Sequence, residues 1–240
     1  MSGGGHLVAS CNGFTLAEVL ITLGIIGVVA AMTMPALIQN ARNRELESAL
    51  KKGASEIAQA LDMYKAENGE PITPDIGYHK LKPLLIQYMN VLEDCGIGAS
   101  DPDKACIKNY GSSSDKNSKI YKNFNGTNSI DLGLFDDGQF VLNDGSLILI
   151  DNNNDSSLVF NLLYISIDIN GLNKRPNRLG QDLFMFQINQ DGKLLPMGAS
   201  GSTYYNDNDI YCSKTSTNNH NGAGCTYKAL SDPTFWKNLP

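Results

Sequence analysis

An uncharged apolar run near the N-terminus constrains this chain most. Residues 19–34 read VLITLGIIGVVAAMTM and contain no charged side chain. Counted from Phe14 to Ile38, the segment has 25 residues. At 1.5 Å per residue it would form a helix about 37 Å long, enough to cross the ~30 Å hydrocarbon core of a bilayer. The sequence therefore predicts one membrane-spanning helix, followed by a region of ordinary globular composition with 42% hydrophobic and 18% charged residues.

The position of Gly13 separates this run from a secretory signal peptide. Such peptides carry their small-residue cleavage site after the apolar run, and their apolar run is shorter. Here Gly13 precedes the run, and the helical pattern continues beyond it. We therefore expect the apolar helix to remain part of the mature chain.

Glu18 is an acid at the start of the apolar segment. A carboxylate costs about 2.5–3.5 kcal/mol near the bilayer centre and less toward the interface, so a retained one usually has a partner. Cleavage between Gly13 and Phe14 would create an α-amino group on Phe14. A neighbouring copy's amine could then pair with Glu18, which favours identical helices packed side by side with an axial offset, as in a filament.

The segment Gly13-Phe14-Thr15-Leu16-Ala17-Glu18, followed by the apolar run and Pro35, closely resembles the class III signal of type IV prepilins and type II secretion pseudopilins. The resemblance implies that a membrane prepilin peptidase cuts between Gly13 and Phe14 and methylates Phe14. It also implies that Glu18 guides subunit docking. The expected organisation is a leader at 1–13, a transmembrane and assembly helix at 14–38, an amphipathic continuation at 39–69 and an exported globular domain at 70–240.

The helical pattern resumes after Pro35, so we expect this proline to kink the helix rather than end it. Asn68-Gly69 followed by Pro71 is a typical helix stop. Between them, apolar residues recur at steps of three and four, which predicts one buried helix face. That face comprises Leu46, Leu50, Ala54, Ile57, Leu61 and Tyr64.

Strand signals dominate the second half of the chain. Asn143-Asp144-Gly145 is a hairpin turn signature between two β-prone runs. The predicted strands are Gln139–Leu142, Ser146–Asp151, Leu158–Ile169, Leu183–Asn189 and Lys193–Pro196, and a short helix is expected over Lys80–Leu92. The predicted fold class is α+β and pilin-like, with an antiparallel β-sheet packed against the second half of the long helix.

A turn-rich stretch between two of these strands adds to the resemblance. It is similar to a signature in the globular domains of some pilin-like proteins. Its residues are Asp168-Ile169-Asn170-Gly171, Pro176-Asn177, Gly180, Asp182 and Phe184.

Four of the five cysteines fall into two local couples, Cys95 with Cys106 and Cys212 with Cys225. This spacing suits two short-loop disulfides in an oxidising compartment, although other connectivities remain open. Zinc sites need tighter C-x-x-C spacing, which neither couple has. The family resemblance adds that a disulfide commonly closes the C-terminal loop, here Cys212–Cys225.

Several oxygen-rich segments raise calcium as the minor alternative to ordinary turns, because calcium takes six to eight oxygen ligands. The foremost is Asp151, Asn153 and Asp155, which lacks the glycine and glutamate of an EF-hand loop. Asp168 with Asn170, and Asp207 with Asp209, are similar. Since Asp and Asn dominate turns by bonding their own backbone, we expect turn chemistry and no cofactor.

Catalytic motifs are missing from the sequence. The histidines His6, His79 and His220 are scattered, and there is no G-x-S-x-G, phosphate-binding loop or helical metal-ligand pair. Trp236 and the pair Tyr204-Tyr205 are expected to pack in the C-terminal loop rather than to form a binding surface. The formal net charge of −6 disfavours a nucleic-acid partner.

The expected function is a structural subunit of a type IV pilus or type II secretion pseudopilus, not an enzyme. Its implied partners are homologous subunits, a prepilin peptidase and an inner-membrane assembly platform. The implied location is the bacterial inner membrane as a single-pass precursor with a periplasmic domain, and then a filament. The alternative is a membrane-tethered binding or sensor domain that never polymerises.

Overall fold

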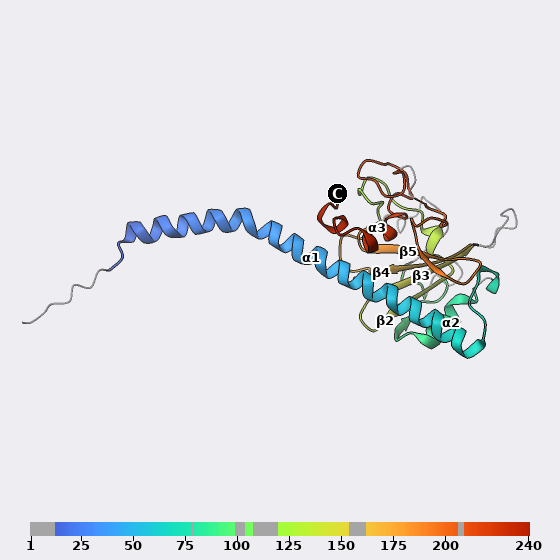
Figure 1. Cartoon of the computed structure of the whole chain (residues 1–240). Helices are drawn as coiled ribbons and strands as arrows, with labels where there is room; N and C mark the ends of the chain where they lie inside the picture. The colour runs from blue at the N-terminus through green and yellow to red at the C-terminus, as the bar shows by residue number, and fades with distance from the viewer. Residues whose placement is uncertain (1–12, 78, 99–103, 108–119, 154–161, 206–208) are drawn as a thin grey trace, which may run out of the picture. The chain divides into compact units, whose positions relative to one another are not determined.

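The structure is a computed structural model that describes residues 13–77, 79–98, 104–107, 120–153, 162–205 and 209–240. The chain divides into two compact units, Met1–Arg42 and Asn43–Pro240. Helix α1 (Leu16–Asn68) begins in the first unit and ends in the second (Figure 1).

The first unit contains the apolar part of α1. The helix continues through Pro35, so the expectation that this proline does not end it is confirmed. From Gly13 to Arg42 every residue is exposed except Ala30, which is half-buried. An 18-residue window reaches a mean hydropathy of 2.2 with none of it buried, so α1 is long and apolar enough to cross a membrane.

The second unit is built on one antiparallel sheet in which each strand pairs with the next along the chain. The strands are β1 (Val91–Asp94), β2 (Gly138–Leu142), β3 (Leu147–Asn153), β4 (Leu162–Asp168), β5 (Leu183–Ile188) and β6 (Leu194–Pro196). Gly145 takes φ +88° in the β2–β3 turn, a conformation that favours glycine. The predicted hairpin at Asn143-Asp144-Gly145 is thus confirmed, and β5 and β6 form another antiparallel pair joined through Asp191-Gly192.

Alternate side chains of β3, β4 and β5 enter two separate cores, as the period of two in a strand requires. In β3, Ile148 and Ile150 face a core that includes Leu46, Leu50 and Ile57 of α1. Leu147 and Leu149 face the opposite core, which loop segments cover. The second half of α1 therefore packs on one face of the sheet, and the predicted α+β fold class is confirmed.

Helix α1 approaches the sheet closely at Gly53. A Cβ atom placed there would lie 2.4 Å from Cδ1 of Ile167 on β4. The predicted buried face is correct in Leu46, Leu50, Ile57 and Leu61. The pattern did not identify Gly53, because glycine carries no hydrophobic signal.

The remaining elements are η1 (Pro74–Ile76), α2 (Leu81–Tyr88), η3 (Leu132–Phe135), α3 (Cys225–Ser231) and η4 (Phe235–Lys237). The predicted helix over Lys80–Leu92 is wrong in its last part. The chain leaves the helix after Tyr88 and forms β1 from Val91, because Val91 and Leu142 are partners in the ladder with β2. Tertiary pairing overrides the local helix preference there.

The C-terminal segment folds back onto α1 within the second unit. Trp236 is buried, and its indole nitrogen donates to the carbonyl of Ala229 over 2.9 Å. The side-chain nitrogen of Asn43 donates to the carbonyl of Trp236 over 2.6 Å. Trp236 is thus a packing residue, as expected.

Candidate functional site

The predicted assembly site lies at the start of α1, where the sequence places Phe14, Thr15 and Glu18 within one turn. The backbone and hydroxyl groups of Thr15 both donate to Oε2 of Glu18, each over 2.8 Å. The Glu18 backbone in turn donates to the Thr15 hydroxyl over 3.2 Å. This reciprocal pattern is a capping box, T-x-x-E, which satisfies donors at the beginning of a helix.

The capping role of Glu18 could have been found from the sequence, because Thr15 and Glu18 have the required spacing. The carboxylate therefore has a local function inside its own chain, and its role between chains stays a prediction. Phe14 beside it is 88% exposed. Both residues named for processing and assembly are accessible at the helix start.

The apolar side chains that follow have no cover within the described chain. Leu20, Leu23 and Ile26 are each 60% or more exposed. Burial of apolar surface contributes about 25 cal/mol per Å², so such a surface is stable only against lipid or other protein. The helix surface, not a pocket, is the candidate functional feature of the first unit.

In the second unit, two disulfides join Cys95 to Cys106 and Cys212 to Cys225. Cys95 and Cys225 are fully buried. The second bridge closes the C-terminal loop and holds the start of α3 in the core, so this part of the predicted fold is confirmed.

In the structure, Asp151 lies beside acidic residues other than those that the sequence suggested. Ligand atoms of Asp136, Asp137 and Asp151 lie within 4.8 Å of one another. Asn153 ends β3, and Asp155 lies outside the described residues. Each carboxylate offers one ligand atom to this cluster, so the three supply three of the six to eight oxygens that calcium takes.

Burial and the neighbouring carboxylates change the acidity of this group. They raise the pKa of Asp151 to about 8 and that of Asp136 to about 6. Nε2 of His79 lies 3.1 Å from Oδ1 of Asp137. The cluster can therefore hold protons near neutral pH without any metal.

The turn-rich stretch after β4 is organised by two fully buried acids, Asp168 and Asp182. Asp168 accepts from the hydroxyl of Tyr121 over 2.5 Å and from the backbone of Gly171 over 2.9 Å. Asp182 accepts from the backbone of Asn177 and Arg178, each over 2.6 Å. Burial raises the pKa of Asp168 to about 7 and that of Asp182 to about 6. Both acids serve to fold the loop between β4 and β5.

Comparison with known proteins supports the reading of the N-terminus. The family described as the prokaryotic N-terminal methylation motif matches residues 9–34. The chain is also similar to the type II secretion system core protein G of Aeromonas hydrophila, at 33% identity over 70 residues. The proteins of the same name from Escherichia coli and Vibrio cholerae are each 35% identical over 70 residues.

These matches cover 29% of this chain and 47–48% of each relative. The chain therefore spans about half the length of the curated relatives it matches. No solved structure matches the chain. The N-terminal part of the chain therefore carries the prokaryotic N-terminal methylation motif and is similar to the type II secretion system core proteins G.

Proposed function

We propose that this chain is a structural subunit of a type II secretion pseudopilus or a related type IV pilus. The observation that carries the proposal is the bare apolar helix that starts directly after Gly13-Phe14 and carries Glu18 in its first turn. Such a surface needs lipid before assembly and neighbouring helices afterwards. The similarity to core proteins G favours the secretion pseudopilus of the two.

Processing by a prepilin peptidase would divide the chain into its functional parts. The peptidase removes residues 1–13 and methylates Phe14. Residues 14–38 then cross the membrane, 39–69 continue the helix, and 70–240 form the exported domain. Exposure of Phe14 and the helix start supports this step, because a peptidase must reach the Gly13–Phe14 bond.

Assembly follows from the charge that cleavage creates. The new amine of Phe14 in one copy pairs with Glu18 of its neighbour, which satisfies a carboxylate held near lipid. One Glu18 oxygen already accepts from Thr15, and a carboxylate can accept further bonds on its other oxygen. The capping hydrogen bonds therefore orient the Glu18 carboxylate and leave its other oxygen able to accept a bond from the neighbouring amine.

The partners in this proposal are other pilin-like subunits, the peptidase and an inner-membrane assembly platform. The globular domain lies on the periplasmic side, where an oxidising environment preserves both disulfides. No reaction is assigned to the chain, and its role is mechanical.

The test combines the mature N-terminus with a substitution at Glu18. We expect mass spectrometry to find N-methylated Phe14, and Glu18→Ala to insert in the membrane normally but to be absent from sheared filaments. Asp62→Ala, which removes another exposed acid of α1, is the matched control and should assemble normally. An intact leader, or normal filaments from Glu18→Ala, would instead favour a non-polymerising membrane-tethered domain.

A further inference from the structure

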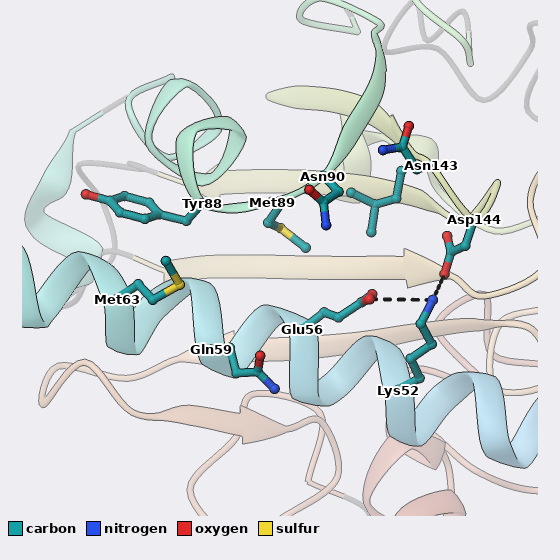
Figure 2. Close-up of a pocket in the computed structure, with 10 residues that line it drawn as sticks. Lys52, Glu56, Gln59, Met63, Tyr88, Met89, Asn90, Asn143 and Asp144 are labelled. Carbon is teal, nitrogen blue, oxygen red and sulfur yellow. Dashed lines mark hydrogen bonds and ion pairs between the residues drawn. The ribbon is translucent and has the colours of Figure 1, made fainter.

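A groove of about 430 Å³ runs along the second half of α1 within the second unit (Figure 2). Its first wall is a stripe of α1 side chains, from Lys52 through Glu56 to Met63. Its second wall is the end of α2 with the connection that follows, and its end is the last residue of β2 with the β2–β3 turn. The residues of these two parts are Tyr88, Met89, Asn90, Leu142, Asn143 and Asp144.

One end of the groove is ionic and the other is apolar. Lys52 forms an ion pair with Asp144 and lies 3.5 Å from Oε1 of Glu56. Figure 2 shows these three side chains gathered at one end, with Met63 and Met89 toward the other. Methionine side chains are flexible and adapt to the shape of an entering group.

Among the three charged side chains at the ionic end, Glu56 is the one whose hydrogen bonding is incomplete. Its Oε2 atom is buried and, within the described part of the chain, accepts no hydrogen bond. A carboxylate oxygen shielded from water without a donor is costly, and a cationic donor is its strongest partner. The groove therefore fits a positively charged side chain whose aliphatic stem lies against the two methionines.

The charge of the whole chain indicates why a second copy would need such a contact. At a formal net charge of −6, identical copies repel one another. Assembly then requires local pairs in which a cation of one copy meets an acid of the next. Glu56 offers the acid, and a different face of α1 must supply the cation.

The proposed pairing of Phe14 with Glu18 indicates the size of the axial step between neighbouring copies. It sets neighbouring parallel helices four residues apart, about 6 Å at 1.5 Å per residue. Within the second unit, Lys51 precedes Glu56 by five residues, about 7.5 Å along the helix, so a parallel copy displaced by a step of similar size would bring its Lys51 close to Glu56. Lys51 stands about 100° around the helix from Lys52 and so lies outside the groove face.

Lys51 is also free to exchange its present contact. Its side chain is 57% exposed and, among the residues that the structure describes, forms an ion pair with Glu47, four residues before it, over 2.6 Å. Exposed helix pairs of this kind contribute about 0.3–0.5 kcal/mol, so replacing one costs little. The lysine stem is long enough to bridge the remaining distance to a helix alongside.

We propose that Lys51 of a neighbouring copy enters this groove and donates to Glu56, giving the filament a second register contact beyond Glu18. Because Lys51 and Glu56 lie on different helix faces, the contact is head-to-tail. Such contacts generate an open helical filament when the rotation between copies does not close into a ring. This inference rests on the proposed polymerisation.

Cysteine pairs test the geometry in the full-length chain in cells. We expect Lys51→Cys combined with Glu56→Cys to form a ladder of disulfide-linked oligomers under mild oxidation. Each single variant is a matched control, because in a head-to-tail contact neither residue meets itself. Absence of the ladder in assembled filaments of the double variant would overturn the proposal.

Charge exchange tests the energetics. Glu56→Lys and Lys51→Glu should each lower filament yield at least about tenfold, and the double exchange should restore it. Glu47→Gln controls for loss of the internal Lys51 pair and should assemble normally. If Glu18→Ala abolishes filaments while all variants at Lys51 and Glu56 assemble, the groove contact is wrong and the proposed function stands. If wild-type chains form no filaments, both proposals fail.

Discussion

The two parts of α1 place similar apolar side chains in opposite environments. Before Arg42, Leu23 is 60% exposed and Ile26 63% exposed. After Asn43, Leu50 and Ile57 are completely buried against the sheet. The second part gains its stability inside the chain, whereas the first part has apolar surface that only lipid or other copies can cover. The same substitution should therefore lower the free energy of unfolding when made in the second part and leave it unchanged when made in the first.

The largest difference is expected for matched leucines. Leu50→Ala should lower the free energy of unfolding of the globular unit by about 2–5 kcal/mol, because it leaves a cavity in a fully buried core. Leu23→Ala should leave that free energy unchanged. Thermal unfolding of the full chain in detergent, followed by near-ultraviolet circular dichroism, measures both. Equal losses in the two variants would contradict the comparison.

Matched glycines should show the same contrast more weakly. The new methyl group of Gly53→Ala would lie 2.4 Å from Cδ1 of Ile167, and relieving that clash should cost about 1–3 kcal/mol. A Cβ atom at Gly27 meets nothing within 4 Å, so Gly27→Ala should not change unfolding. The same melting experiment applies, and a stabilised Gly53→Ala variant would show that the helix can move off the sheet.

Most of the first part of α1 was predictable from the sequence, and less of the second unit was. The apolar run, Gly13-Phe14 and Glu18 are contiguous, so their physical meaning is local. Strands β2, β3, β5 and β6 were predicted because turn residues mark the hairpins between them. Strand β1 was missed, since its pairing with β2 depends on residues about 50 positions away.

The acidic cluster shows that contacts between single residues far apart in the sequence were not predictable either. Asp151 was considered with Asn153 and Asp155, its neighbours along the chain. The sheet instead brings it to Asp136 and Asp137. Sequence spacing cannot show such a contact, because it is set by the register between β2 and β3.

The buried acids should make stability depend on pH in the second unit. A carboxyl with a higher pKa when folded contributes stability that is present below its unfolded pKa near 4 and lost as the pH rises through its folded value. For Asp151 that value is about 8, raised by burial and by Asp137 and Asp136. The melting temperature should therefore fall between pH 4 and pH 8.

Asp151→Asn tests this dependence directly. The variant should flatten the decline and be more stable than wild type at pH 8 by about 1 kcal/mol, or a few degrees in melting temperature. The gain is small because Asp136, Asp137 and Asp151 share the proton equilibrium. Melting curves at several pH values measure it, and an unchanged slope would place the pH dependence elsewhere, foremost at Asp168 and Asp182.

The smallest effect is expected at Lys52, which pairs with Asp144 of the β2–β3 turn and with Glu56 of its own helix. Its side chain is 54% exposed, and exposed ion pairs contribute about 0–1 kcal/mol. Lys52→Ala should thus lower the melting temperature only slightly, and added salt should shrink the difference further by screening. A loss comparable to that of Leu50→Ala would mean that these ion pairs, rather than the apolar face, hold the second part of α1 on the sheet. The contrast between the two parts of α1 would then concern charge and not burial.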